Sequence, residues 1–140
     1  MMTDPALKPH PVIDPGTAPY WAALGEGRLI LKSCKDCGRA HFYPRETCPH
    51  CHSDHLGWID ASGQGEIYSF TTCHRPAGPA FKADAPYVVA IVSLAEGPRM
   101  MTRIDDPEGL KIGAPVRVVF KQQDPDLVLP FFEIVREPKP

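Results

Sequence analysis

The sequence predicts a mainly β protein in which a short N-terminal helix and a cysteine-based metal ribbon precede a five-stranded barrel of the OB-fold type. Three observations lead to this prediction. Two C-x2-C pairs are separated by ten residues in CKDCGRAHFYPRETCPHC, residues 34–51. Five strand-like segments with glycine-marked turns fill most of residues 61–140. The 17 prolines among 140 residues disfavour long helices and favour loops and edge strands.

Length and charge restrict the class of protein. A chain of 140 residues fits one ordinary domain, or two small modules that share a core. Its 15 basic and 17 acidic residues give a net charge of -2, which argues against nucleic-acid binding, because that needs clustered positive charge. No signal peptide and no apolar run of membrane-span length is visible. We therefore expect a cytoplasmic protein with no membrane partner, whose paired cysteines bind metal instead of forming disulfides.

The first 27 residues are expected to form an extended arm followed by a short helix. Residues 1–17 contain four prolines and little hydrophobic pattern. The segment TAPYWAALGEG then has a capping residue in Thr17, a first-turn proline in Pro19, and two glycines that end the helical pattern. The chain is accordingly divided into an arm and helix at 1–27, a zinc ribbon at 28–60 and an OB-fold barrel at 61–140.

The cysteine pairs indicate one structural zinc ion. A strand over Arg28–Lys32 leads into the first pair, and each C-x2-C turn points two thiolates at one ion while backbone N–H groups point at the sulfurs. A site with four protein ligands has no open position, so we expect a structural role in a segment too small to fold alone. Iron, as in rubredoxin, is the alternative, because sulfur ligands do not choose between the two metals. The predicted ligands are Cys34, Cys37, Cys48 and Cys51. Four histidines, His41, His50, His52 and His55, are expected at the surface or beside the ligands.

The barrel is predicted from five segments of strand-like character. The strongest is YVVAIVSL, and PVRVVFK alternates inward apolar with outward basic residues. The sequence EGP after YVVAIVSL marks a hairpin turn, and Asp106–Leu110 is the expected place for a helical turn between the third and fourth strands. The predicted strands are Glu66–Thr72, Tyr87–Leu94, Arg99–Ile104, Pro115–Lys121 and Phe131–Arg136.

A fifth cysteine and a long loop follow the first barrel strand. Cys73 and His74 are adjacent, and neighbouring residues on an extended chain point to opposite faces, so they do not predict a nucleophile and its base. Arg75 is a better candidate for an anion contact. The loop PAGPAFKADAPY is either functional, as long loops in compact domains tend to be, or an ordinary surface loop.

The order of the motifs resembles a known family. EGRLILKSC, CxxCG, FYPR, CPxC, Trp58, SGxGxIYSFT, HRP, PYVVAIVSL, EGPR and IGAPVRVVF follow one another as in acyl-CoA-associated proteins that join a zinc ribbon to an OB fold, long catalogued as a domain of unknown function. The similarity covers residues 18–135. It implies a rubredoxin-like ribbon, an OB barrel, and a non-catalytic accessory or scaffold subunit of a thiolase-like enzyme: a thiolase, an acyltransferase or a lipid-transfer-protein-like aldolase.

The resemblance also supplies candidate contacts. The small protein of such a complex helps to bind acyl-CoA, whose phosphates need cations and whose adenine needs a flat apolar face. The acyl-CoA candidates are Phe42, Arg45, Arg75, Phe81, Lys82 and Tyr87. A short helix unstable alone is suited to docking, so its exposed face, Tyr20, Trp21 and Leu24, is the candidate contact with the partner. The alternative is that the two rings pack on this chain's own ribbon.

Three other functions are alternatives to the scaffold role. A single-stranded nucleic-acid module would need aromatic residues flanked by basic ones on the barrel face, where only scattered arginines are expected. A rubredoxin-like electron carrier would need iron. A free-standing esterase or transferase would need Cys73 as nucleophile, with no orienting group in evidence. We therefore expect no catalytic residue in this chain, no nucleic-acid partner, and a coenzyme A thioester as a possible ligand.

Overall fold

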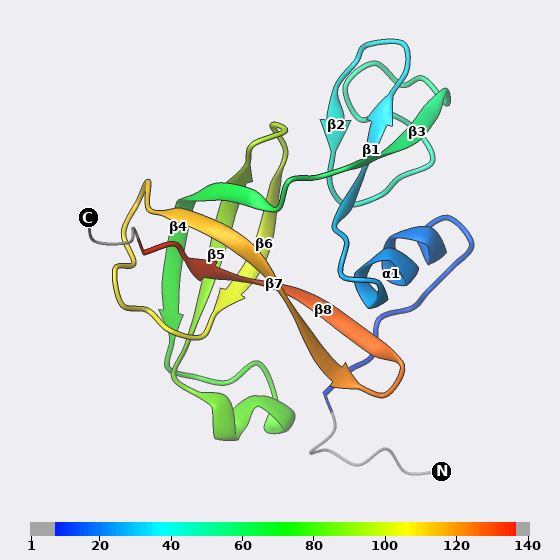
Figure 1. Ribbon diagram of the computed structural model, residues 1–140. Helices are drawn as coiled ribbons and strands as arrows, with labels where there is room; N and C mark the ends of the chain where they lie inside the picture. The colour runs from blue at the N-terminus through cyan, green and yellow to red at the C-terminus, as the bar shows by residue number, and fades with distance from the viewer. Residues whose placement is uncertain (1–7, 137–140) are drawn as a thin grey trace, which may run out of the picture.

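The computed structural model describes residues 8–136, which form two antiparallel sheets and one short α-helix (Figure 1). The smaller sheet carries the cysteines, the larger one curls into the barrel, and α1 lies beside β8 and β1. The elements are α1 (Ala18–Gly25), β1 (Ile30–Cys34), β2 (Ala40–His41), β3 (Leu56–Asp60), β4 (Gln64–Cys73), the 3-10 helix η1 (Pro79–Asp84), β5 (Tyr87–Leu94), β6 (Arg99–Ile104), β7 (Pro115–Asp124) and β8 (Leu127–Ile134).

Helix α1 begins where predicted, but its cap differs. Thr17 makes no side-chain capping bond. Instead Asp14 Oδ1 accepts the backbone N–H of Thr17 (2.9 Å), and the Asp14 carbonyl accepts that of Ala18 (2.8 Å). The helix ends at Gly25, and Gly27 follows it with a φ of +76°, a conformation that glycine adopts without strain; its N–H donates to the Leu24 carbonyl (3.0 Å).

The small sheet has the order β2-β1-β3. β1 is central and pairs with β3 from Ile30↔Asp60 to Cys34↔Leu56, so the first cysteine lies at the end of a paired strand. β3 was not among the predicted strands. Its sequence, LGWID, contains a glycine and has little alternation, and it becomes a strand because β1 offers it an unpaired edge.

The large sheet has the order β6-β5-β4-β7-β8. β6 and β8, the two outer strands, contact each other, and Thr102 Oγ1 donates to the Pro130 carbonyl (3.4 Å) across the join. This five-stranded, partly open barrel is the OB architecture. At the start of β4 a Cβ added to Gly65 would collide with the Ser93 carbonyl, so glycine allows the close approach of β4 and β5 there.

The predicted barrel strands agree with the structure in part. β5 and β6 have the predicted bounds, β4 and β7 are longer, and β8 begins four residues earlier than expected. The helical turn expected at Asp106–Leu110 was wrong: a tight turn forms there, in which Glu108 N–H donates to Asp106 Oδ1 (3.1 Å). The 3-10 helix η1 instead lies in the loop between β4 and β5. Within residues 8–136, no helix has the length and apolarity needed to cross a membrane.

One buried cluster draws residues from the helix, the ribbon and the barrel. Leu24 of α1, Leu31 of β1, Ile67 of β4, Val92 of β5 and Phe132 of β8 all belong to it and are at most 1% exposed. The two sheets therefore share a core. The division of the chain at residues 27 and 60 stays a prediction.

Candidate metal centre and ligand surfaces

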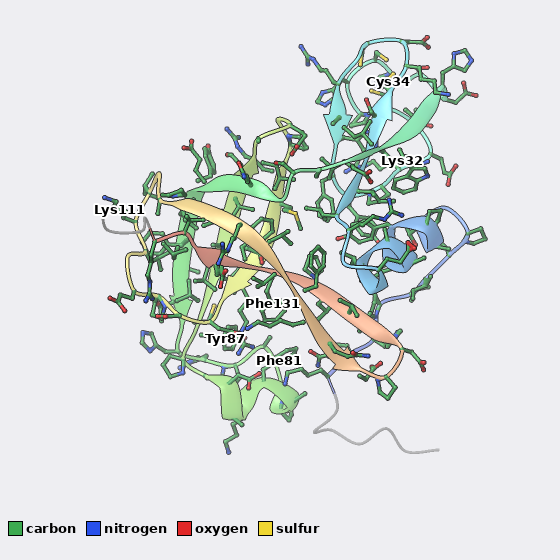
Figure 2. The ribbon with its side chains drawn as sticks, viewed as in Figure 1. Lys32, Cys34, Phe81, Tyr87, Lys111 and Phe131 are labelled. Carbon is green, nitrogen blue, oxygen red and sulfur yellow. The ribbon has the colours of Figure 1, made fainter. Side chains whose placement is uncertain are left out.

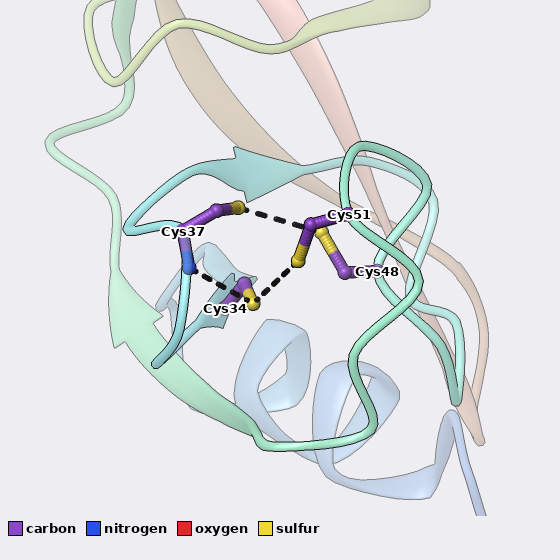
Figure 3. A group of neighbouring side chains, drawn as sticks. All are labelled: Cys34, Cys37, Cys48 and Cys51. Carbon is purple, nitrogen blue, oxygen red and sulfur yellow. Dashed lines mark hydrogen bonds between the residues drawn. The ribbon is translucent and has the colours of Figure 1, made fainter.

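The four predicted cysteine ligands converge at the tip of the ribbon (Figure 3). Their sulfurs all lie within 4.8 Å of one another. The Sγ atoms of Cys34 and Cys51 are 3.5 Å apart, and those of Cys37 and Cys48 are 3.7 Å apart. A zinc ion with bonds of about 2.3 Å to a tetrahedron of sulfurs would hold them about 3.8 Å apart. The cysteines are thus positioned for one metal ion, and their spacing fits zinc.

Backbone groups around the sulfurs favour thiolates. The N–H of Cys37 donates to Cys34 Sγ (3.4 Å), and the N–H of His50 donates to Cys48 Sγ (3.4 Å). The first of these bonds is the main cause that lowers the pKa of Cys34 to about 6. Ser53 N–H acts in the same direction on Cys51, but hydrogen bonds with the other thiols raise the pKa of Cys51 to about 12. Such a cluster of four thiols holds its charge best when a cation shares it.

The histidines near the site fall into two groups. His50, His52 and His55 are exposed, and His55 contacts Asp36 (3.2 Å). His41 is different: it is 3% exposed, and neither ring nitrogen has a hydrogen-bond partner within the described residues. Burial is the main cause that lowers the pKa of His41, and charge interactions with its neighbours, among them Arg45 and Lys32, act in the same direction and favour the neutral imidazole. Sequence reasoning did not expect this buried imidazole.

The docking face predicted on α1 is largely buried. Tyr20 and Leu24 are each 1% exposed, so the expectation that both present themselves to a partner is wrong. The physical reason is that the helix is pressed into the shared core, where the Tyr20 ring packs edge-on against Trp21 and Tyr43. Burial raises the pKa of Tyr20 for the same reason. For Tyr20 the alternative, packing within this chain, is confirmed.

Trp21 remains at the surface of the helix. It is half-buried, and its Nε1–H donates to the hydroxyl of Tyr43 (3.1 Å). Tyr43 is 38% exposed and was missed as a candidate. Its position beside Phe42 in the FYPR motif is the feature of the sequence that could have identified it. The two rings form an exposed aromatic pair that bridges α1 and the ribbon.

The six acyl-CoA candidates lie in separate places. Phe42 and Arg45 line a groove between the ribbon and the β5–β6 turn. Phe81 and Tyr87 have ring centroids 6.3 Å apart at the end of the barrel distant from Cys34 (Figure 2). The remaining candidates, Arg75 and Lys82, are exposed on the loop between β4 and β5.

The cations near Phe81 and Tyr87 already have carboxylate partners. Arg103 lies 5.1 Å from the centre of the Tyr87 ring, and its Nη1 donates to Asp84 (3.0 Å). Lys8 lies 5.5 Å from the Phe81 ring and also pairs with Asp84 (3.1 Å). The hydrogen bond from Arg103 is the main cause that lowers the pKa of Asp84. These contacts attach η1 to the barrel.

Among the residues that the structure describes, no base lies within hydrogen-bonding distance of the Cys73 sulfur. This cysteine is half-buried at the end of β4, and within residues 8–136 its sulfur makes no hydrogen bond. Its backbone pairs with Tyr87 in the sheet.

Family models match two consecutive parts of the chain. The one described as ChsH2, rubredoxin-like zinc ribbon domain, matches residues 21–57. The one described as ChsH2, C-terminal OB-fold domain, matches residues 58–121. These parts contain the ribbon with its four cysteines and most of the barrel.

Two similar proteins carry names that describe a scaffold protein and an enzyme subunit. A DUF35 domain-containing scaffold protein of Methanocaldococcus jannaschii is 40% identical over 97 residues, 67% of this chain and 68% of that protein. A probable enoyl-CoA hydratase alpha subunit of Thermomonospora curvata is 38% identical over 129 residues, 91% of this chain and 40% of that protein. This chain therefore spans less than half of the length of the Thermomonospora protein.

A solved structure matches nearly the whole ribbon–barrel unit. One chain of the Ltp2-ChsH2(DUF35) aldolase superposes with a TM-score of 0.77 at 36% identity, over 89% of this chain and 98% of that chain. The two family models place the ribbon before the barrel along this chain, and the Methanocaldococcus scaffold protein matches 67% of it at 40% identity. The chain therefore belongs to the DUF35 family, with a ChsH2-type zinc ribbon followed by a ChsH2-type OB-fold domain.

Proposed function

We propose that this chain is a non-catalytic accessory subunit of a thiolase-like enzyme, that it carries one structural zinc ion, and that it helps to bind acyl-CoA. The match to a chain of the Ltp2-ChsH2(DUF35) aldolase carries the proposal, because it covers 98% of that chain at 36% identity. A match of this extent compares the whole unit, including any surface that contacts a partner, and not merely the barrel fold, which by itself would say nothing of function. The name scaffold protein given to the Methanocaldococcus relative points the same way.

The proposed zinc ion holds the ribbon together. Cys34 ends β1 and Cys37 lies in the turn that follows it, whereas Cys48 and Cys51 come from the loop before β3. A bound ion would tie these two turns to each other, and with four thiolates it would keep no position for substrate. The family description as a zinc ribbon favours zinc over the iron of an electron carrier. No disulfide joins cysteines within residues 8–136, which suits the reducing cytoplasm, where we place the protein.

The proposed contact with the partner centres on Trp21 and Tyr43. Tyr20 and Leu24 fix the helix in the core, so Trp21 is held in place before binding and loses little conformational freedom when a partner covers it. Aromatic side chains with a polar atom are enriched among the residues that dominate interface energy. The hydrogen bond between the two rings adds to this preorganisation.

Co-purification with quantitative mass spectrometry tests the proposal. The tagged full chain, expressed in its native host, should retain a thiolase-like enzyme in stoichiometric amount through size-exclusion chromatography. Trp21→Ala should reduce the retained amount, whereas Lys111→Gln, an exposed change on the loop before β7, should not. Retention of nucleic acid, or of no thiolase-like enzyme by the wild-type chain, would contradict the proposed function.

A further inference from the structure

A groove of about 550 Å³ separates the ribbon from the turn between β5 and β6. Its walls come from two places far apart in sequence: β2 with the two cysteine turns on one side, and Glu96–Arg99 on the other. Its volume is that of a small-molecule site. Its charged and aromatic lining residues are Arg39, His41, Phe42, Arg45, His50, Glu96 and Arg99.

Unpaired arginines are concentrated in this groove. Of the eight arginines in the chain, Arg28, Arg103, Arg117 and Arg136 form ion pairs with carboxylates. Within residues 8–136, the other four have no carboxylate within 4.0 Å, and three of these line the groove. The three are Arg39, Arg45 and Arg99. Guanidinium groups without an internal counter-ion, gathered in one concave site, are suited to an external anion, above all phosphate.

Arg99 is held in a fixed position. Its guanidinium carbon lies 3.7 Å from the centre of the Tyr68 ring, and its Nε donates to Ser93 Oγ (3.3 Å). Neither contact neutralises its charge. A cation that is both oriented and unpaired loses little freedom when an anion binds.

The buried imidazole of His41 also points to a ligand in this groove. It lines the same groove, is 3% exposed, and neither ring nitrogen has a partner within the described residues. A neutral imidazole offers one N–H donor and one acceptor. Buried polar groups are nearly always hydrogen-bonded, so a side chain with two unused positions at the wall of a groove indicates a ligand that has both kinds of group.

One acidic residue opposes anion binding. Glu96 Oε2 accepts the backbone N–H of Ser62 (2.8 Å), which partly satisfies its charge, while Oε1 is buried and has no partner among residues 8–136. The groove therefore holds three arginines against one carboxylate. Phe42 adds a flat apolar wall on which a planar heterocycle can stack.

We propose that this groove binds the phosphate groups of a small molecule that also carries a planar heterocycle. The ligand chemistry is that of a nucleotide, whose source is either the nucleotide end of coenzyme A, an assignment that rests on the proposed function, or a free nucleotide. All lining residues belong to this chain. Binding should therefore occur without the partner enzyme.

Titration calorimetry of the full chain tests this inference with coenzyme A, ADP and pyrophosphate as probes. We expect all three to bind, and Arg45→Gln to weaken each about ten- to a hundredfold through loss of a charged hydrogen bond. Glu96→Gln keeps an oxygen for Ser62 and removes the opposing charge, so it should strengthen binding. Lys111→Gln removes one positive charge elsewhere on the surface and should leave binding unchanged. Thermal unfolding of each variant shows whether it is folded.

The probes separate the two sources. Coenzyme A that binds more tightly than ADP supports the coenzyme, and equal affinities support a free nucleotide; either result supports the groove. Absence of binding by every probe would overturn the inference, as would equal losses in Arg45→Gln and Lys111→Gln. Partner capture by the same variants keeps the two proposals apart. A chain that binds the probes but retains no enzyme refutes the accessory role alone, and one that retains its enzyme but binds no probe refutes the groove alone.

Discussion

Replacing Cys48 by serine should weaken zinc binding by roughly two to three orders of magnitude. Structural zinc sites contribute about 10–16 kcal/mol in zinc-finger peptides. If four thiolates contribute equally, the loss of one removes about a quarter of this free energy, which corresponds to roughly two to three orders of magnitude in the dissociation constant. The hydroxyl is a poorer ligand than the thiolate. Cys48 Sγ is also fully buried and 3.7 Å from Cys37 Sγ, so no water or other ligand has direct access to its place.

The same change should release the loop that contains Cys48. Its backbone N–H donates to the Ser53 carbonyl (2.8 Å) and its carbonyl accepts the N–H of His52 (2.9 Å), so both bonds are local to that loop. Without the metal, the loop is tied to the end of β1 by the bond from Lys35 N–H to the His55 carbonyl (2.8 Å) and by the contacts of Asp36 with Ser53 and His55, which are exposed. A segment of this size has too little core of its own to stay folded without such a link.

Competition with a zinc chelator measures the affinity, and amide hydrogen exchange of β1 and β3 measures the folding of the ribbon. Cys73→Ser is the matched control, because this half-buried sulfur makes no hydrogen bond within residues 8–136 and should keep the metal. The reasoning fails if Cys48→Ser binds zinc like the wild type, or if it loses zinc while the exchange of the ribbon amides is unchanged.

Three further predictions concern the helix, the barrel and the loop. Leu24→Ala should lower the free energy of unfolding by about 2–5 kcal/mol in denaturant titrations, because it leaves a cavity in the core. Trp21→Ala should chiefly weaken the affinity for the partner. If instead Trp21→Ala costs more stability and Leu24→Ala costs more affinity, the roles given to these two residues are wrong. Gly65→Ala should push β4 from a backbone carbonyl of β5 and lower the melting temperature, and an unchanged melting temperature would contradict the collision. Asp84→Asn should free η1 from Arg103 and speed its proteolysis at neutral pH. Since the pKa of Asp84 is lowered, its tether is present above the ordinary carboxyl pKa and is lost as pH falls through the lower value in the folded chain, so acid should give the wild type the same sensitivity.

The sequence was most informative where neighbouring residues alone determine the local structure. The C-x2-C spacing identified the four cysteines because two intervening residues are what a turn needs to aim two sulfurs at one ion. β5 and β6 were predicted with their correct bounds because alternation and the EGP turn define them without help from distant residues.

The rest depended on contacts between segments far apart in the chain. β3 forms through pairing with β1, which its own residues hardly indicate. The helical pattern identified Tyr20 and Leu24 as one face of α1, but only the position of β8 and the ribbon shows that this face is covered. The groove is the clearest case, because Arg45 and Arg99 are distant in sequence and line one groove only because the fold brings the ribbon close to the β5–β6 turn.

The shared core also constrains how such chains can be recombined. Leu31 of the ribbon and Phe132 of the barrel belong to one buried cluster, and α1 contacts both β1 and β8, so one helix packs against both sheets. A chimera that takes its ribbon from one relative and its barrel from another would give this helix one surface to which it was never fitted. We therefore expect helix, ribbon and barrel to stay together as one unit, both in fusions to longer polypeptides and when the fold is transplanted in the laboratory.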